Sequence, residues 1–177
     1  MKKALITGIS GQDGSYLAEY LLEQNYEVFG IVRRNSTPEN QSTRLDPILD
    51  KIKNFYGDLS DCSSIERVIQ QVKPDEIYNV AEIPQYTVET NAIGVLNVLE
   101  AYRRYCPEAK FYQASSSEMF GLSVDEDGCQ RETTDMNPVS PYGCSKVFGY
   151  NIVRNYRRAY NLHATNGILF NHESPRR

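Results

Sequence analysis

The sequence has no tryptophan, only two histidines and only four cysteines among its 177 residues. The cysteines stand at positions 62, 106, 129 and 144, and they form no Cys-x-x-Cys pair and no spacing typical of disulfides. Scattered thiols and so few histidines give no zinc-binding pattern. We therefore expect reduced thiols, a cytoplasmic protein and no metal site.

A surplus of positive charge is also lacking, because 19 Lys and Arg residues stand against 23 Asp and Glu residues, for a formal net charge of −4. A protein that mainly binds nucleic acid needs cations to neutralise phosphates, so that class is not expected. No apolar run reaches the roughly 20 residues that span a bilayer. Gly8 and Gly11 interrupt the apolar start of the chain too early for a signal peptide. Neither nucleic acid nor a membrane is therefore an expected partner.

Strand and helix patterns alternate from the first residues onward. Short apolar runs predict six strands, at residues 3–7, 27–32, 54–56, 76–80, 110–114 and 163–170. Amphipathic spacing predicts helices over residues 14–24, 88–105 and 142–160, and another around Ile65 that either Ser60 or Asp61 caps. The same periodicity predicts which helix residues face inward: Leu17, Tyr20, Leu21, Val95, Val98, Leu99, Tyr102, Val153 and Tyr156. This alternation implies right-handed crossovers and an α/β fold, a doubly wound parallel sheet of Rossmann-like type.

Three glycines stand between the first strand and the first helix, as Gly8-x-x-Gly11-x-x-Gly14. The first permits a tight turn, the second lets the backbone approach a pyrophosphate, and the third allows close packing of helix and strand. The free N–H groups of a helix N-terminus then favour an anion. Dinucleotide binding is the favoured interpretation, and an ordinary glycine turn is the alternative.

The end of the second strand carries Arg33 and Arg34, where a site for NAD usually has an acidic residue. A guanidinium can bind a 2′-phosphate through two charge-assisted hydrogen bonds, whereas a carboxylate would repel it. NADP is therefore favoured over NAD, although both arginines could be solvated loop residues. Asp58, after the third strand, either accepts a hydrogen bond from adenine or caps the next turn.

Tyr142 and Lys146 form a Tyr-x-x-x-Lys motif at the start of a predicted helix. The spacing of four residues places the phenol and the ammonium on one helix face. A nearby positive charge favours the phenolate and so prepares a tyrosine for proton transfer. The alternative is a core aromatic residue beside a lysine that extends to solvent.

The fifth strand is followed by Ser116 and Glu118, at the edge where open α/β sheets keep their active sites. Ser116 can hydrogen-bond the oxygen that Tyr142 deprotonates. A hydride-transferring reductase does not need Glu118, whereas an enzyme that removes a carbon-bound proton and expels water does. A surface carboxylate without a function is the alternative.

These motifs together resemble the extended short-chain dehydrogenase/reductase family, and most closely its GDP-mannose 4,6-dehydratases. The resemblance covers nearly the whole chain through ALITGISGQDGSYLAEYLLE, the arginine pair, YGDLSD, FYQASSSE, SPYGCSK and GILFNHESPRR. The glycine turn and the Tyr-x-x-x-Lys motif are shared by the whole superfamily. The first and last of the six motifs point to the branch that dehydrates GDP-sugars. Family members normally have threonine where Ser116 stands, and serine retains the hydroxyl of that threonine.

The resemblance implies an NADP-dependent lyase that converts GDP-mannose to GDP-4-keto-6-deoxy-mannose in GDP-fucose or GDP-rhamnose synthesis, working as a dimer or tetramer. It implies catalysis by Ser116, Glu118, Tyr142 and Lys146, and substrate contacts from Ser116 and Asn171. The implied cofactor contacts are Gly8, Ile9, Ser10, Gly11, Gln12, Asp13, Arg33, Asp58, Leu59, Tyr86, Lys146, His172 and Arg177. A GDP-heptose dehydratase, a 4-keto-sugar reductase and a non-catalytic NADP-binding module stay open as alternatives.

Two segments of this family are absent from the sequence. One is a longer connection between residues 78–81 and 83–86, and the other is a smaller substrate-binding lobe beyond Arg177. Both segments would be flexible parts of a longer protein. We therefore favour a longer protein, of which these segments are not included in this sequence, over a protein that was shortened by truncation. Residues 1–177 are then expected to be the NADP-binding domain, which carries the catalytic residues.

Overall fold

Strand β1 (Lys3–Thr7) lies inside a six-stranded parallel sheet in the computed structural model, which describes residues 1–33, 44–80 and 89–176. The strand order is β3-β2-β1-β4-β5-β6. The other strands are β2 (Glu27–Val32), β3 (Lys53–Tyr56), β4 (Glu76–Asn79), β5 (Lys110–Ser116) and β6 (Ala164–Leu169). All six predicted strands are confirmed, and their shared direction brings their carboxyl ends to one edge.

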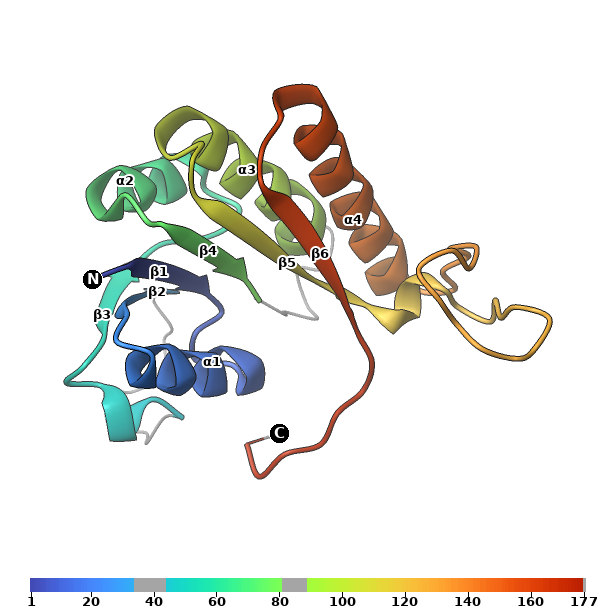
Figure 1. The fold of residues 1–177 in the computed structure, drawn as a ribbon, viewed down its shortest axis with the longest axis horizontal. Coiled ribbons are helices and arrows are strands. Elements are labelled where there is room, and N and C mark those ends of the chain that lie inside the picture. The colour runs from blue at the N-terminus through green and yellow to red at the C-terminus, as the bar shows by residue number, and fades with distance from the viewer. Residues whose placement is uncertain (34–43, 81–88, 177) are drawn as a thin grey trace.

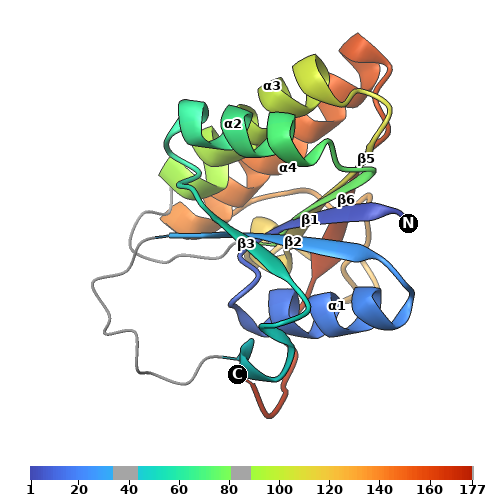
Figure 2. The same ribbon diagram turned by 90° about the vertical axis from the view of Figure 1, so that its left-hand side faces the viewer.

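Helices cover both faces of the sheet, which confirms the doubly wound architecture. Figure 2 shows α1 (Gln12–Glu23) on one face, and α2 (Cys62–Val72), α3 (Gly94–Tyr105) and α4 (Pro141–Tyr160) on the other. Short helical segments are η1 (Asp46–Ile48), η3 (Glu89–Ile93) and η4 (Ser117–Met119). After β6, the chain returns toward the side of α1 (Figure 1). None of the helices in the described ranges has the length and apolar character needed to cross a membrane.

Two hydrophobic clusters hold the layers together, one on each face of the sheet. In the cluster that α2, α3 and α4 share, the six inward-facing residues predicted on α3 and α4 are buried. Full burial of each large apolar side chain stabilises the fold by about 1.5–3 kcal/mol. On α1 the prediction for Tyr20 is wrong, because 57% of this residue is exposed. The prediction for Leu21 is confirmed, and Leu17 is partly buried against the cluster that contains Leu21. Gly14 and Ala18 are also buried, and these small residues let the helix approach the sheet closely.

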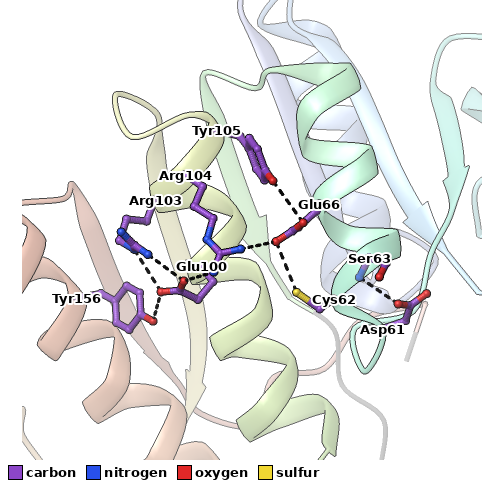
Figure 3. Close-up of polar contacts among 9 residues, drawn as sticks. All are labelled: Asp61, Cys62, Ser63, Glu66, Glu100, Arg103, Arg104, Tyr105 and Tyr156. Atoms are coloured by element: carbon purple, nitrogen blue, oxygen red, sulfur yellow. Dashed lines mark hydrogen bonds and ion pairs between the residues drawn. The ribbon is translucent and has the colours of Figure 1, made fainter.

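Two carboxylates connect the three helices of the larger layer (Figure 3). Glu100 on α3 accepts hydrogen bonds from Arg103, Arg104 and the Tyr156 hydroxyl of α4, the last at 2.5 Å. Hydrogen bonds from Arg103 and Tyr156 lower the pKa of Glu100 to about 2. Glu66 on α2 accepts from Arg104 at 2.8 Å. The network therefore fixes α4, the helix that carries Tyr142 in its first turn, against its neighbours.

The helix after β3 begins at Cys62, and Asp61 rather than Ser60 caps it. The Asp61 carboxylate accepts a hydrogen bond from the Ser63 N–H at 3.0 Å (Figure 3). The helix predicted over residues 88–105 is divided, because Glu89–Ile93 form a π-helix directly before α3 begins at Gly94. A π-helix has no distinct periodicity over five residues, so the apolar spacing did not distinguish it from the α-helix that follows.

Candidate active site

The turn between β1 and α1 has the geometry expected of its glycines. Gly8 has φ +71°, in the left-handed region that favours glycine. A Cβ atom on Gly14 would lie 2.2 Å from the Gly8 carbonyl oxygen, so the helix packs against the turn at a distance that only glycine permits. Ser10 and Gly11 are exposed at the start of α1, whereas the Ile9 side chain is fully buried in the core. Of these residues, Ile9 can therefore contact a ligand only through its backbone.

Arg33 follows β2 and is exposed at the same edge of the sheet. Burial opposes ionisation of the nearby Asp58, but hydrogen bonds from Ser60 and the charge of Arg33 hold the pKa of Asp58 below its ordinary value. The Asp58 carboxylate accepts from the Ser60 N–H at 2.9 Å, so it caps this turn. Leu59 is buried, and its carbonyl accepts from Asn97. Three residues named from the sequence lie outside the described ranges: Arg34, Tyr86 and Arg177.

The segment after β6 lies against the glycine turn. His172 Nε2 is 2.7 Å from the Asp13 carboxylate, and its Nδ1 is 2.8 Å from the Phe170 carbonyl oxygen. Both oxygens are acceptors, so only a doubly protonated imidazole donates to both. Arg176 adds a 2.6 Å ion pair with Glu19 on α1. Asn171, the residue before His172, is exposed. The fold therefore brings residues 171–176 to the predicted phosphate site.

The Tyr-x-x-x-Lys motif occupies the first turns of α4. Tyr142 is half-buried, and the Lys146 ammonium lies 5.4 Å from the centre of its ring. Lys146 is only 2% exposed, and its Nζ donates to the Ala114 carbonyl at 3.0 Å. The alternative of a lysine extending to solvent is therefore wrong, because this ammonium points into the protein toward the end of β5.

Ser116 and Glu118 lie at the carboxyl end of β5, beside the start of α4. The Glu118 N–H donates to Ser116 Oγ at 3.2 Å, and Ser140 Oγ donates to Glu118 Oε2 at 3.0 Å. Ser140 is the N-cap residue of α4, two positions before Tyr142. Glu118 is exposed and Tyr142 half-buried, so neither is covered by packed helices. The structure therefore brings the hydroxyl, carboxylate, phenol and ammonium groups to one edge of the sheet.

A chain of buried polar side chains, which the sequence did not predict, runs beneath this site. Thr7 Oγ1 donates to Asn79 Oδ1, and Asn79 Nδ2 donates to Gln113 Oε1 at 2.8 Å. Gln113 Nε2 then donates to the Ala114 carbonyl oxygen at 3.0 Å. The only sequence signal is a polar residue near the end of each of three buried strands.

Within the described ranges, no three His, Cys, Asp or Glu side chains are grouped so that they could hold a metal ion. Cys62, Cys106, Cys129 and Cys144 all lie in those ranges and are free thiols.

Known proteins with similar sequences include GDP-mannose 4,6-dehydratases. One from Drosophila melanogaster is 50% identical over 195 positions, covering 99% of this chain and 48% of the relative. One from Vibrio cholerae is 50% identical over 192 positions, covering 99% of this chain and 51% of the relative. The chain thus spans about half the length of these relatives. The first alignment is longer than the 177 residues of this chain, so that relative has residues within the aligned region that this chain lacks.

The fold is shared with a solved dTDP-glucose 4,6-dehydratase from Bacillus anthracis in complex with NAD, at a TM-score of 0.85 and 27% identity. That match covers 99% of this chain and 57% of the other. The family model described as GDP-mannose 4,6 dehydratase matches residues 5–177. That match spans the glycine turn, the Ser116–Glu118 pair and the Tyr142–Lys146 motif together, and by it the chain belongs to the GDP-mannose 4,6 dehydratase family.

Proposed function

We propose that the protein containing this chain dehydrates GDP-mannose to GDP-4-keto-6-deoxy-mannose, a reaction that supplies GDP-fucose or GDP-rhamnose synthesis. The observation that carries the proposal is the 3.0 Å hydrogen bond from Ser140 Oγ to Glu118 Oε2. It holds a carboxylate beside the helix turn that presents Tyr142. Oxidation and reduction at one carbon need no such carboxylate, whereas removal of a proton from carbon and loss of water do.

The residues around the glycine turn fit a dinucleotide with a 2′-phosphate, so NADP is the proposed cofactor. The positive φ of Gly8 and the close approach at Gly14 leave the start of α1 open to a pyrophosphate. Arg33 offers a guanidinium where sites for NAD have a carboxylate. When bound, NADP⁺ would accept a hydride from C4 of the hexose and return it to C6. Its net consumption is therefore zero.

The side chains of this chain would divide the proton transfers. Tyr142, as phenolate, takes the proton of the C4 hydroxyl, and the buried Lys146 ammonium 5.4 Å from its ring favours that form. The Ser116 hydroxyl donates a hydrogen bond to the C4 oxygen. Glu118 takes the proton from C5, which the C4 ketone has made acidic, and passes a proton to the C6 hydroxyl, which leaves as water. When the hydride returns to C6, the proton that Tyr142 took from the C4 hydroxyl would pass to C5, which restores the phenolate.

The test uses the full-length protein with GDP-mannose and a catalytic amount of NADP. Mass spectrometry is expected to show a product that has lost one water. In a parallel assay with added NADPH and a 4-keto-sugar nucleotide, stoichiometric consumption of NADPH would indicate a reductase instead. NADP binding with unchanged GDP-mannose would indicate a non-catalytic module, and turnover restricted to a GDP-heptose would change the substrate. The cytoplasmic location and the oligomeric state stay predictions.

A variant assigns the base. Glu118→Gln is expected to abolish the dehydrated product while the NADP affinity, measured by titration, is unchanged. Glu126→Gln removes an exposed carboxylate from the loop between η4 and α4 and serves as the matched control. An undiminished rate in Glu118→Gln would overturn the assignment of the base.

A further inference from the structure

The hydroxyl of Ser140 makes two hydrogen bonds in opposite directions. It donates to Glu118 Oε2 at 3.0 Å and accepts from the Gly143 N–H at 2.9 Å. A hydroxyl has one proton, and an N–H can only donate, so that proton must point to the carboxylate. One atom therefore joins the Glu118 side chain to the first turn of the helix that carries Tyr142.

Glu118 needs such a partner because little else fixes its side chain. It is exposed and lies in η4, a 3-10 helix of three residues. An exposed glutamate samples several rotamers, and holding it in one costs up to about 2 kcal/mol of conformational entropy. The hydrogen bond from Ser140 selects one rotamer and engages only one of the two carboxylate oxygens. The other oxygen is the one that would act on substrate.

The backbone of Glu118 is held against the same helix turn. A Cβ atom on Gly143 would lie 2.7 Å from the Glu118 carbonyl oxygen, so these backbones are in close contact. The Glu118 N–H also donates to Ser116 Oγ. The backbone of the glutamate is therefore placed by β5 and α4 independently of Ser140, and the Ser140 hydroxyl acts on the carboxylate group alone.

We propose that Ser140 is a positioning residue that aims the Glu118 carboxylate at C5 of the hexose while it caps α4. This inference rests on the proposed function and assigns a residue that neither Tyr-x-x-x-Lys nor the serine–glutamate motif includes. Loss of the Ser140 hydroxyl should slow removal of the C5 proton and leave oxidation at C4 unchanged.

The test compares three variants of the full-length protein. Ser140→Ala removes both hydrogen bonds, and dehydration should slow by about 10- to 100-fold with little change in KM, since a misplaced base loses orientation rather than binding. Ser140→Thr keeps the hydroxyl and should restore the rate. Ser140→Asp keeps a good helix cap but cannot donate to Glu118. It should therefore melt at the wild-type temperature and yet be as slow as the alanine variant.

Kinetic isotope effects identify the affected step. With GDP-mannose deuterated at C5, the isotope effect on kcat should rise in Ser140→Ala, because proton removal becomes rate-limiting. With substrate deuterated at C4, it should not rise. NADP affinity, measured by titration, should be equal in all variants.

Each outcome decides the proposal. A wild-type rate in Ser140→Asp would reduce Ser140 to a helix cap, and an unchanged C5 isotope effect in Ser140→Ala would also overturn the positioning role. Both results leave the proposed function intact, since the wild-type protein in the same assay still dehydrates GDP-mannose. Failure of the wild-type protein to do so would overturn the proposed function and the role of Ser140 with it.

Discussion

Gln113 and Lys146 donate hydrogen bonds to the same acceptor, the carbonyl oxygen of Ala114, each at 3.0 Å. Both side chains are almost completely buried, at 3% and 2% exposed. The Gln113 amide is itself held by Asn79, which is held by Thr7. The position of the ammonium group next to Tyr142 therefore depends on the ends of β1, β4 and β5 together.

Replacing Gln113 tests whether this buried chain of polar side chains stabilises the fold. Gln113→Leu leaves the buried Asn79 amide without its acceptor, which is expected to lower the free energy of unfolding by about 1–3 kcal/mol. Urea unfolding measures the change. Gln70→Leu, at an exposed position on α2, is the matched control and should shift stability by less than about 0.5 kcal/mol. Equal effects of the two substitutions would contradict a structural role for the buried chain.

Two glycines of the first turn should respond differently to alanine. A Cβ on Gly14 would lie 2.2 Å from a backbone oxygen, whereas one on Gly11 would lie 3.2 Å from the same atom. Gly14→Ala is therefore expected to destabilise the fold by about 1–3 kcal/mol or more. Gly11→Ala should cost at most about 1 kcal/mol but weaken NADP binding, since its methyl group stands where the pyrophosphate approaches. Thermal unfolding and NADP titration separate the two effects, and equal stability of the two variants would contradict the packing role of Gly14.

The choice between NADP and NAD should depend on Arg33. Arg33→Ala removes the guanidinium proposed for the 2′-phosphate, and the affinity for NADP is expected to fall by about 10-fold or more. The affinity for NAD, which has no 2′-phosphate, should change by less than about threefold. Fluorescence titration with each nucleotide measures both constants. An equal loss of affinity for both nucleotides would indicate that Arg33 contacts a part of the molecule that NADP and NAD share.

The Glu100 network predicts a pH dependence of stability. Hydrogen bonds from Arg103 and Tyr156 hold the pKa of Glu100 at about 2, below its ordinary value of 4.5. A depressed carboxyl pKa contributes stability that is fully present above the unfolded-state pKa and is lost as the pH falls through the folded-state value. Because the network is partly exposed to solvent, its contribution is expected to be about 1 kcal/mol.

The comparison of wild type with Glu100→Gln measures this contribution. The difference in their unfolding free energies should be constant above about pH 5 and shrink as the pH approaches about 2. Chemical unfolding at several pH values gives the curve. A difference that grows on acidification would contradict the proposed charge state of Glu100.

Several features could be predicted from the sequence because they depend on residues close together in the chain. The apolar runs gave the six strands, and the spacing of Val95, Val98 and Leu99 gave the buried face of α3. The turn at Gly8 was predicted because only glycine adopts its backbone conformation at low cost. Tyr142 and Lys146 were predicted as neighbours because helical geometry brings residues four apart together.

Periodicity alone failed where the exact centre of a helix's buried face decided the outcome. Tyr20 continues the apolar spacing of α1, yet it is exposed, because the helix is buried through the face that carries Gly14, Ala18 and Leu21, and Tyr20 lies off that face. The sequence also left Asp58 open between two roles. Its bond to Ser60 depends on the local turn, whereas the contact with adenine stays a prediction.

The sequence by itself determined the order of strands and helices, the glycine turn and the identity of the reactive groups. Only the tertiary structure decided that Ser140 reaches Glu118 across 22 positions and that Thr7 reaches Asn79 across 72. Such hydrogen bonds have no local sequence signature, because the secondary-structure propensity of a serine or an asparagine is the same whether or not a partner far away in the sequence lies nearby in the fold. They form when parallel strands bring their carboxyl ends to one edge and burial makes an unpaired polar group costly.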